Sequence, residues 1–176
     1  MVIKLPSKVT FILGGAASGK SAFAEEICVK SGKDRVYLAT SQVFDREMRA
    51  KVDRHLQQRG EGWTTHEAPM DVAPVLDSLG ADQICLLDCA TMWLSNHMLA
   101  EDGDLASAQR DLLDALARCA ADVVVVSNET EQGIVPDNAL ARRFREAQGR
   151  LNIELAKVAD TVVQFPAGLP PVLERA

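Results

Sequence analysis

The sequence predicts an α/β fold in which a mainly parallel sheet is flanked by helices. Segments with strand patterns alternate with segments of helical periodicity, an order typical of strands joined by crossover helices. The stretch DVVVVS, residues 122–127, contains four consecutive valines, which indicate a central strand buried on both faces. No linker, repeat or low-complexity stretch divides the 176 residues, so we expect a single domain over residues 1–176.

The first part of the chain is expected to alternate twice between strand and helix. The apolar run Val9–Leu13 predicts a strand, and helical periodicity from Ser21 to about Lys30 predicts the helix that follows it. Arg35–Ala39 predicts a second strand, which a polar loop joins to a short helix carrying His55. The stretch RGEGWTTHEAP, residues 59–69, has no period and is expected to be a long loop.

The remaining elements continue the alternation. Ile84–Leu87 predicts a buried strand that ends at Asp88, and a helix is expected from about Leu105 to Cys119. After the valine strand, Pro136 suits the first turn of a long amphipathic helix that extends to about Ala159. Thr161–Phe165 predicts a last strand, and a proline-rich tail ends the sequence.

Composition and charge argue against several classes of function. With 47% hydrophobic and 25% charged residues, the chain has the composition of an ordinary soluble domain. A formal net charge of −6 gives little electrostatic support for binding nucleic acid or an anionic membrane. No apolar run approaches the length of a membrane span and no opening stretch resembles a secretion signal, so we expect a cytoplasmic protein.

The four cysteines are expected to be structural. Cys28, Cys85, Cys89 and Cys119 lack the paired spacing of a metal site, and three of them lie in apolar surroundings. A cysteine in such surroundings behaves as a small hydrophobic residue. We therefore expect neither disulfides nor a structural zinc ion.

The stretch GGAASGKS matches the phosphate-binding loop pattern of glycine, four residues, glycine, lysine and serine. Glycines let backbone amides approach phosphate oxygens, and the following helix directs its positive end toward the same anion. Lys20 would neutralise the β- and γ-phosphates, and the hydroxyl of Ser21 would bind Mg²⁺. The predicted nucleoside triphosphate site comprises Gly14, Gly15, Ala16, Ala17, Ser18, Gly19, Lys20 and Ser21.

Asp88 is the second anchor of this site. It ends a buried strand, and the ends of parallel strands converge on the phosphate loop, where a carboxylate can organise Mg²⁺. An isolated aspartate at a strand end is more often a helix cap, but Lys20 and Ser21 favour the metal role. Ser21 and Asp88 are therefore the predicted metal ligands.

The stretch KVDRHLQQR leaves two interpretations of His55. Beside the apolar positions of a short helix, His55 could simply pack against the core. Lys51, His55 and Arg59 are also spaced four residues apart, so on a helix they would form one row of nitrogen donors facing an anion.

Three stretches together resemble one enzyme family: GGAASGKSAFAE, VYLATSQVFDREMRAKVDRH and VVVVSNETEQGIVPDNALARRFREAQGRLN. They resemble the bifunctional adenosylcobinamide kinase and adenosylcobinamide-phosphate guanylyltransferase of cobalamin biosynthesis. The resemblance runs from Ile12 to the tail. It implies a P-loop NTPase fold with a RecA-like sheet, and a homotrimer. Two departures are Ala17, where the family often has arginine, and the additional residues 60–62.

The resemblance implies two reactions. A nucleoside triphosphate, ATP or GTP, would phosphorylate the hydroxyl of adenosylcobinamide, and GTP would then give GMP to the new phosphate. The second reaction would pass through GMP bonded to a histidine, which by position is His55. A neutral imidazole is a good nucleophile, and nearby Lys51, Arg54 and Arg59 would disfavour its protonated form and attract the triphosphate. The corrinoid substrate rests on the resemblance alone.

The same resemblance extends the expected nucleotide pocket. It includes Ala39, Thr40 and Ser41 after the second predicted strand, although Ser41 could merely cap a helix. Glu67 would accept hydrogen bonds from guanine, or would otherwise be a solvated charge. The residues expected near the nucleotide around His55 are Lys51, Leu56, Gln57, Gln58 and Arg59.

The sequence assigns no role to several polar residues. Asn128 and Glu129 follow the valine strand and could contact phosphates, metal or corrinoid. Arg142, Arg143 and Arg145 could equally be a solvated helix face. His97 is expected to be structural, and the family has no requirement for a histidine at His66.

Two other functions are compatible with the phosphate loop. One is a monofunctional small-molecule kinase in which His55 only packs, and which therefore forms no covalent nucleotide. The other is a regulatory protein that binds GTP without consuming an acceptor, although the sequence offers no added recognition domain for it.

Overall fold

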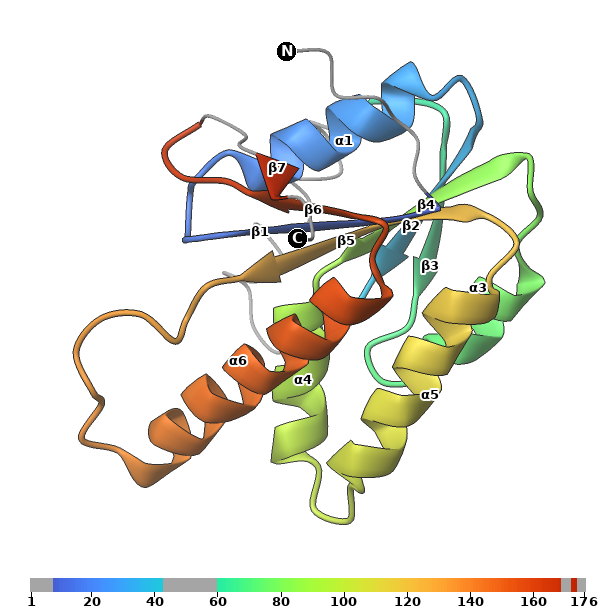
Figure 1. Ribbon diagram of the computed structural model, residues 1–176. Coiled ribbons are helices and arrows are strands. Elements are labelled where there is room, and N and C mark those ends of the chain that lie inside the picture. Colours follow the sequence, from blue (N-terminus) through green and yellow to red (C-terminus); the bar gives the residue numbers. More distant parts are fainter. Residues whose placement is uncertain (1–7, 43–59, 169–171, 174–176) are drawn as a thin grey trace.

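The computed structural model describes residues 8–42, 60–168 and 172–173 (Figure 1). Within this part of the chain, one sheet has the strand order β3-β2-β4-β5-β1-β6-β7. Neighbouring strands pair in parallel except β6 and β7, which are antiparallel. The strands are β1 (Val9–Gly14), β2 (Asp34–Ala39), β3 (Trp63–Glu67), β4 (Gln83–Asp88), β5 (Asp122–Asn128), β6 (Thr161–Gln164) and β7 (Val172–Leu173).

Helices cover both faces of the sheet. Helix α1 lies on one face, and α4, α5 and α6 lie on the other, together with the short α3 (Figure 1). The helices are α1 (Lys20–Lys30), α3 (Ala73–Ser78), α4 (Ala90–Leu99), α5 (Leu105–Arg118) and α6 (Ala139–Val158). None of the helices in the described part of the chain is long and apolar enough to cross a membrane.

The valine strand explains why the sheet has a core on each side. Val123 and Val125 pack in the core beneath α3–α6, whereas Val124 and Val126 pack in the core beneath α1. All four are 1% exposed. Because successive side chains of a strand point to opposite faces, a strand buried on both faces needs a continuous apolar run. The prediction of a central, doubly buried strand at residues 122–127 is confirmed.

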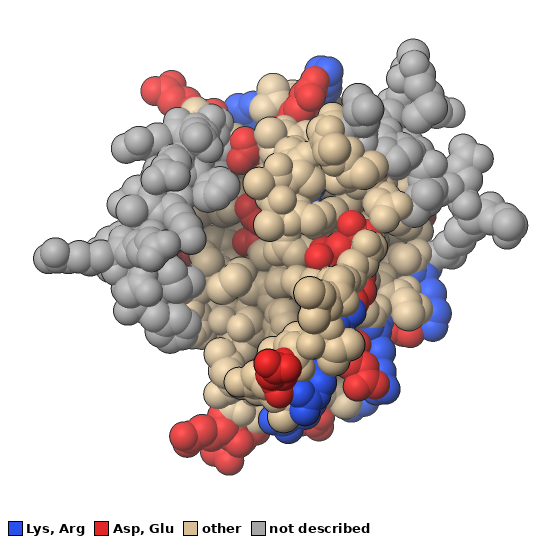
Figure 2. Space-filling model, turned by 90° about the vertical axis from the view of Figure 1, so that its left-hand side faces the viewer, with Lys and Arg blue, Asp and Glu red and all other residues tan. Residues whose placement is uncertain are grey.

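The carboxyl ends of the parallel strands lie along one edge of the sheet. Gly14 at the end of β1 is in register with Asn128 of β5, and Ala39 of β2 is in register with both Asp88 and Glu67. Figure 2 looks onto this side of the molecule, where a recess of uncharged surface lies beside acidic side chains. Polar groups that follow several different strands therefore share this edge.

One predicted loop is wrong. The stretch 59–69 contains strand β3, which pairs with β2 at the edge of the sheet. Trp63 packs edge-on against Tyr37 with ring centroids 6.3 Å apart. Most β3 side chains are partly or fully exposed, so the strand lacks both the apolar run and the regular alternation that would have predicted it.

The start of α6 and the structure of the tail also differ from the predictions. Helix α6 begins at Ala139 and not at Pro136, because the Asn138 side chain accepts hydrogen bonds from the backbone NH groups of Leu140 and Ala141. The proline-rich tail contains β7, whose Val172 pairs with Val163. The predicted helix around His55 lies outside the described residues.

Candidate active site

The phosphate loop joins β1 to α1, as predicted, and its conformation depends on glycine at two positions. Gly19 has φ = 95°, a left-handed conformation that side chains disfavour. A Cβ atom on Gly14 would lie 2.7 Å from the carbonyl oxygen of Phe165 and 2.8 Å from Oγ of Ser18. Gly14 therefore has no room for a side chain, and Gly19 provides the left-handed backbone conformation that the turn needs.

Lys20 begins α1 and folds back over the loop. Its side chain donates a hydrogen bond to the carbonyl oxygen of Gly15 at 3.0 Å, and the residue is only 7% exposed. Burial lowers the pKa of Lys20 from its ordinary value, and nearby Cys89, Asp88 and Glu129 partly offset that effect. A cation held away from water interacts strongly with an incoming phosphate, which suits the predicted role.

The chain after β6 supports the phosphate loop, which the sequence did not reveal. The backbone NH of Phe165 donates to the carbonyl oxygen of Leu13 at 2.7 Å, and that of Gly168 donates to Ser18 at 3.0 Å. The Phe165 ring packs against Phe23 of α1 with centroids 5.0 Å apart. No local sequence signal could reveal this support, because it depends on β6 lying beside β1.

Asp88 lies at the carboxyl end of β4, as predicted. Its Oδ2 accepts a hydrogen bond from the Tyr37 hydroxyl at 2.8 Å, which orients the carboxylate. The Asp88 carboxylate and the Ser21 hydroxyl are hard oxygen donors of the kind Mg²⁺ prefers, and Mg²⁺ commonly completes its shell with substrate phosphates and water. The donor set therefore fits a magnesium ion brought with a nucleotide. Tyr37 was not among the predicted site residues.

Thr40 connects the ends of neighbouring strands. It is fully buried, and its hydroxyl donates to the carbonyl oxygen of Cys89 and accepts from the Cys89 NH at 2.7 and 2.8 Å. The Asn96 side chain of α4 donates to the carbonyl oxygens of Thr40 and Pro69. The side chain of Thr40 thus holds the edge together, while Ala39 and Ser41 flank it.

Asn128 and Glu129 lie beside the phosphate loop. The Glu129 NH donates to the carbonyl oxygen of Gly14 at 3.1 Å. The Asn128 NH donates to the Thr91 hydroxyl at 2.9 Å, and the Asn152 side chain donates to the Asn128 carbonyl oxygen at 3.3 Å. Contacts from the loop and from two helices therefore fix the backbone that follows β5.

Glu67 is not close to the phosphate loop. It is exposed at the carboxyl end of β3, and the strand order places β2, β4 and β5 between β3 and β1. Neighbouring strands are about 4.8 Å apart, so β3 lies roughly 19 Å from β1. The sheet therefore brings Lys20, Asp88 and Glu129 to one region and leaves Glu67 near the far end of the same edge.

His97 and His66, which were not predicted to belong to the site, both lie among the described residues. His97 packs on Trp93 with ring centroids 4.4 Å apart, and its Nε2 lies 3.0 Å from the carbonyl oxygen of Met70, contacts that favour a structural role. His66 is partly buried on β3. The remaining predicted site residues lie outside the described residues: Lys51, His55, Leu56, Gln57, Gln58 and Arg59.

The four cysteines are buried, which fits the predicted packing as small hydrophobic residues, and each is a free thiol. Burial raises the pKa of Cys28 and of Cys89 to about 12. Cys89 is therefore a neutral thiol at neutral pH, although it directly follows Asp88. A protonated, buried thiol is a poor nucleophile, so the cysteine beside the phosphate loop is not a catalytic candidate.

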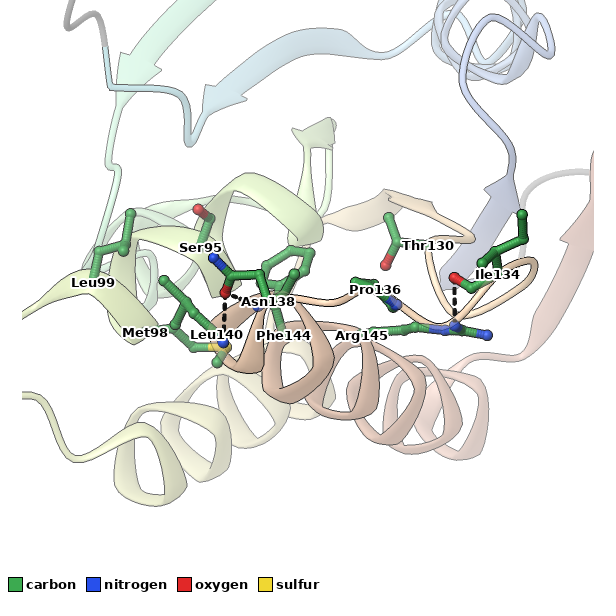
Figure 3. A pocket seen from close by; sticks show the side chains of 11 residues that line it. Ser95, Met98, Leu99, Thr130, Ile134, Pro136, Asn138, Leu140, Phe144 and Arg145 are labelled. Carbon is green, nitrogen blue, oxygen red and sulfur yellow. Dashed lines mark hydrogen bonds between the residues drawn. The ribbon is translucent and has the colours of Figure 1, made fainter.

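A groove of about 520 Å³ lies between α4, the segment after β5 and the beginning of α6 (Figure 3). Met98, Leu140 and Phe144 contribute apolar surface, and Ile134 on its wall is 96% exposed. The Arg145 side chain donates to the carbonyl oxygens of Glu131, Gly133 and Ile134, which shapes that wall. The wall begins at Thr130, one residue beyond Glu129, whose backbone NH donates to the carbonyl oxygen of Gly14 in the phosphate loop.

Residues 10–173 match the family model described as cobinamide kinase / cobinamide phosphate guanyltransferase. The chain is 39% identical to the bifunctional adenosylcobalamin biosynthesis protein CobP of Pseudomonas aeruginosa, over 93% of this chain and 95% of that protein. It is 37% identical to the bifunctional adenosylcobalamin biosynthesis protein CobU of Salmonella typhimurium, over 90% and 95% respectively.

Solved structures with little sequence similarity share the fold. The RadB recombinase superposes with a TM-score of 0.53 at 13% identity, covering 93% of this chain and 85% of that one. The flagellar accessory protein FlaH of Methanocaldococcus jannaschii gives 0.53 at 10% identity, covering 95% and 78%. These likenesses confirm the predicted RecA-like P-loop NTPase fold and no more. The match of nearly the whole chain to one family model, with relatives at this level of identity, means that the chain belongs to the cobinamide kinase / cobinamide phosphate guanyltransferase family.

Proposed function

We propose that this chain catalyses both reactions named by its family. It phosphorylates adenosylcobinamide with ATP or GTP, and then transfers GMP from GTP to adenosylcobinamide phosphate with release of pyrophosphate. The observation that carries the proposal is the phosphate loop, in which buried Lys20 lies over the backbone at the carboxyl edge of the sheet. Membership in the family supplies the acceptor.

The phosphate loop provides the binding energy and charge for phosphoryl transfer. Backbone NH groups of the loop and the amino end of α1 hold the triphosphate, and Lys20 neutralises its developing charge. Ser21 and Asp88 would hold Mg²⁺, which when bound screens the phosphate oxygens. Tyr37 keeps the Asp88 carboxylate in position through its hydrogen bond.

The guanylyl transfer is proposed to use His55 as the nucleophile. The sequence places basic residues on both sides of His55, and a neutral imidazole attacks phosphorus readily. A covalent guanylyl-enzyme divides the transfer into two displacements. Pyrophosphate leaves in the first, and the phosphate of the corrinoid then takes the GMP at the same site in the second. This intermediate also distinguishes the bifunctional enzyme from a monofunctional kinase.

The groove beside β5 is the proposed place for part of the corrinoid acceptor. Its wall begins next to Glu129, and apolar side chains occupy most of its lining (Figure 3). A corrin ring presents methyl groups and carboxamides, which suit apolar surface with scattered polar groups such as Ser95 and Asn138. This placement is supported by Thr130, which lines the groove and directly follows Glu129, whose NH donates to Gly14 of the phosphate loop.

Glu67 is proposed to recognise guanine in the second reaction. Because β3 lies at the far end of the edge from β1, GTP would have to lie along the edge with its base toward β3. We expect Glu67→Gln to weaken GTP binding more than ATP binding, since an amide presents only one acceptor oxygen to the two guanine donors. Titration of both nucleotides against both proteins measures this, and Glu61→Gln provides an exposed acidic control. Equal losses for GTP and ATP would exclude base recognition by Glu67.

Product analysis tests the two activities directly. The purified chain with magnesium, adenosylcobinamide and ATP should give a product heavier by one phosphoryl group. Subsequent addition of GTP should convert it into the guanylylated product and release pyrophosphate. Hydrolysis of GTP without either corrinoid product would instead favour the regulatory alternative.

The resemblance also motivates a proposal about assembly and place. We propose a homotrimer in the cytoplasm that acts on small molecules and not on nucleic acid. The acidic net charge of −6 supports the absence of a nucleic-acid partner. Light scattering on the purified chain would measure the mass of the assembly.

A further inference from the structure

The side chains of Glu129 and Gln164 are hydrogen-bonded to each other near the beginning of the phosphate loop. Glu129 directly follows β5, and Gln164 is the last residue of β6. Strand β1 lies between β5 and β6, and Leu13 of β1 is in register with Gln164. The Gln164 amide donates to Oε1 of Glu129 at 2.8 Å, so this hydrogen bond joins the two strands flanking β1, where the phosphate loop starts.

The backbone of Glu129 is fixed as firmly as its side chain. Its NH group donates to the carbonyl oxygen of Gly14, and Asn128 before it is held by Thr91 and Asn152. The carboxylate also contributes to the electrostatic surroundings of Lys20. Glu129 is partly buried, so it is neither a solvated surface charge nor sealed in the core.

Two carboxylates act on Lys20, and only one has an assigned role. Asp88 is oriented by Tyr37 and suits magnesium. Glu129 follows β5 on the side of β1, where its NH donates to Gly14, and it directly precedes Thr130, the first residue of the groove wall. Phosphoryl transfer to an alcohol needs a group that accepts the hydroxyl proton, and a positioned carboxylate can do this.

We propose that Glu129 is the catalytic residue that accepts the proton of the corrinoid hydroxyl during phosphoryl transfer, and that Gln164 positions it. The inference rests on the proposed function. The acceptor oxygen bonds to the γ-phosphorus while the bond from that phosphorus to the bridging oxygen breaks. The electron pair of the broken bond leaves with the nucleoside diphosphate. The hydroxyl proton moves to Oε2 of Glu129, because Oε1 already accepts from Gln164, and is later released to water.

Guanylyl transfer does not need this proton acceptor. Its proposed first nucleophile is an imidazole, which attacks in its neutral form and so has no hydroxyl proton to give up, and its second is a phosphate, which is ionised near neutral pH. Removing the carboxylate of Glu129 should therefore affect the two reactions differently. A residue that only stabilises the fold, or one that binds phosphate or magnesium in both reactions, would affect them together.

The experiment compares Glu129→Gln with Glu154→Gln, a partly buried acidic control on α6 whose carboxylate pairs with Lys157. Glu129→Gln should lower kcat for adenosylcobinamide phosphorylation by about 10²- to 10⁴-fold, the usual contribution of a general base. The KM for ATP should change little. GMP transfer to separately prepared adenosylcobinamide phosphate should stay within about threefold of the unaltered protein, as should both reactions of Glu154→Gln.

Variants of Gln164 test the positioning role. Gln164→Leu should lower kcat of phosphorylation with little change in KM and no loss of guanylyl transfer, and Gln164→Asn should recover less than full activity because its amide is shorter. Normal phosphorylation by Glu129→Gln, or a parallel loss of both reactions in a protein that unfolds at the usual temperature, would overturn the inference. If the unaltered protein phosphorylates no corrinoid, the proposed function fails instead.

Discussion

Lys20→Ala should slow both phosphoryl transfer and guanylyl transfer. Lys20 is the buried cation of the phosphate loop, and each reaction develops negative charge on phosphate oxygens. Loss of such a donor removes about 2–4 kcal/mol of transition-state stabilisation, roughly a thirty- to thousandfold fall in rate. Initial rates of both reactions, with saturating nucleotide and with limiting nucleotide, measure the loss.

Two further variants separate the charge of Lys20 from its geometry. Lys30→Ala removes an exposed lysine from the same helix, where it pairs with Glu26, and should change neither reaction. Lys20→Arg keeps the charge but replaces a compact ammonium by a planar guanidinium, so it should recover only part of the activity. Normal phosphorylation by a folded Lys20→Ala protein would contradict the assignment of the phosphate loop as the kinase site.

The elements predicted from sequence are those with strong local signals. The valines of β5 and the glycines of the phosphate loop each reflect a constraint that acts within a few residues, namely burial on two faces and a turn toward an anion. Strand β3 was missed because an edge strand needs apolar contacts on fewer sides, and its partly exposed residues carry no clear alternation. Sequence periodicity therefore identifies the centre of this sheet better than its edge.

The candidate site shows the same division. Lys20 and Asp88 were identified because a loop pattern and a strand end mark them locally. The hydrogen bonds from Tyr37 to Asp88 and from Gln164 to Glu129 were not predicted, since both depend on the strand order. Residues separated by 51 and 35 positions meet only because β2 pairs with β4 and β1 separates β5 from β6. Contacts that orient side chains of the candidate site therefore become visible only when the strand order is known.

The proposed covalent intermediate can be detected by labelling the protein with GTP, and loss of that label in His55→Ala is the largest effect we expect from a single substitution. Incubation with magnesium and GTP labelled in the α-phosphate should leave the label on the denatured protein, because in the proposed mechanism GMP becomes bonded to His55. GTP labelled only in the γ-phosphate should leave none, since that phosphate departs with pyrophosphate. A phosphoramidate bond is cleaved in acid and survives in base, so the stability of the label identifies the attachment to an imidazole nitrogen.

His55→Ala should abolish both the label and GMP transfer, while phosphorylation of adenosylcobinamide should largely survive because that reaction needs no covalent enzyme intermediate. His66→Ala is the matched control, since His66 is a partly buried histidine of the edge strand and should keep the label. A histidine that only packs would act through stability and would reduce both reactions together. A label that persists in His55→Ala and maps to His66 or His97 would assign the nucleophile elsewhere. Loss of only one reaction, with an unchanged unfolding temperature, would establish that one chain performs two transfers with separate chemical groups.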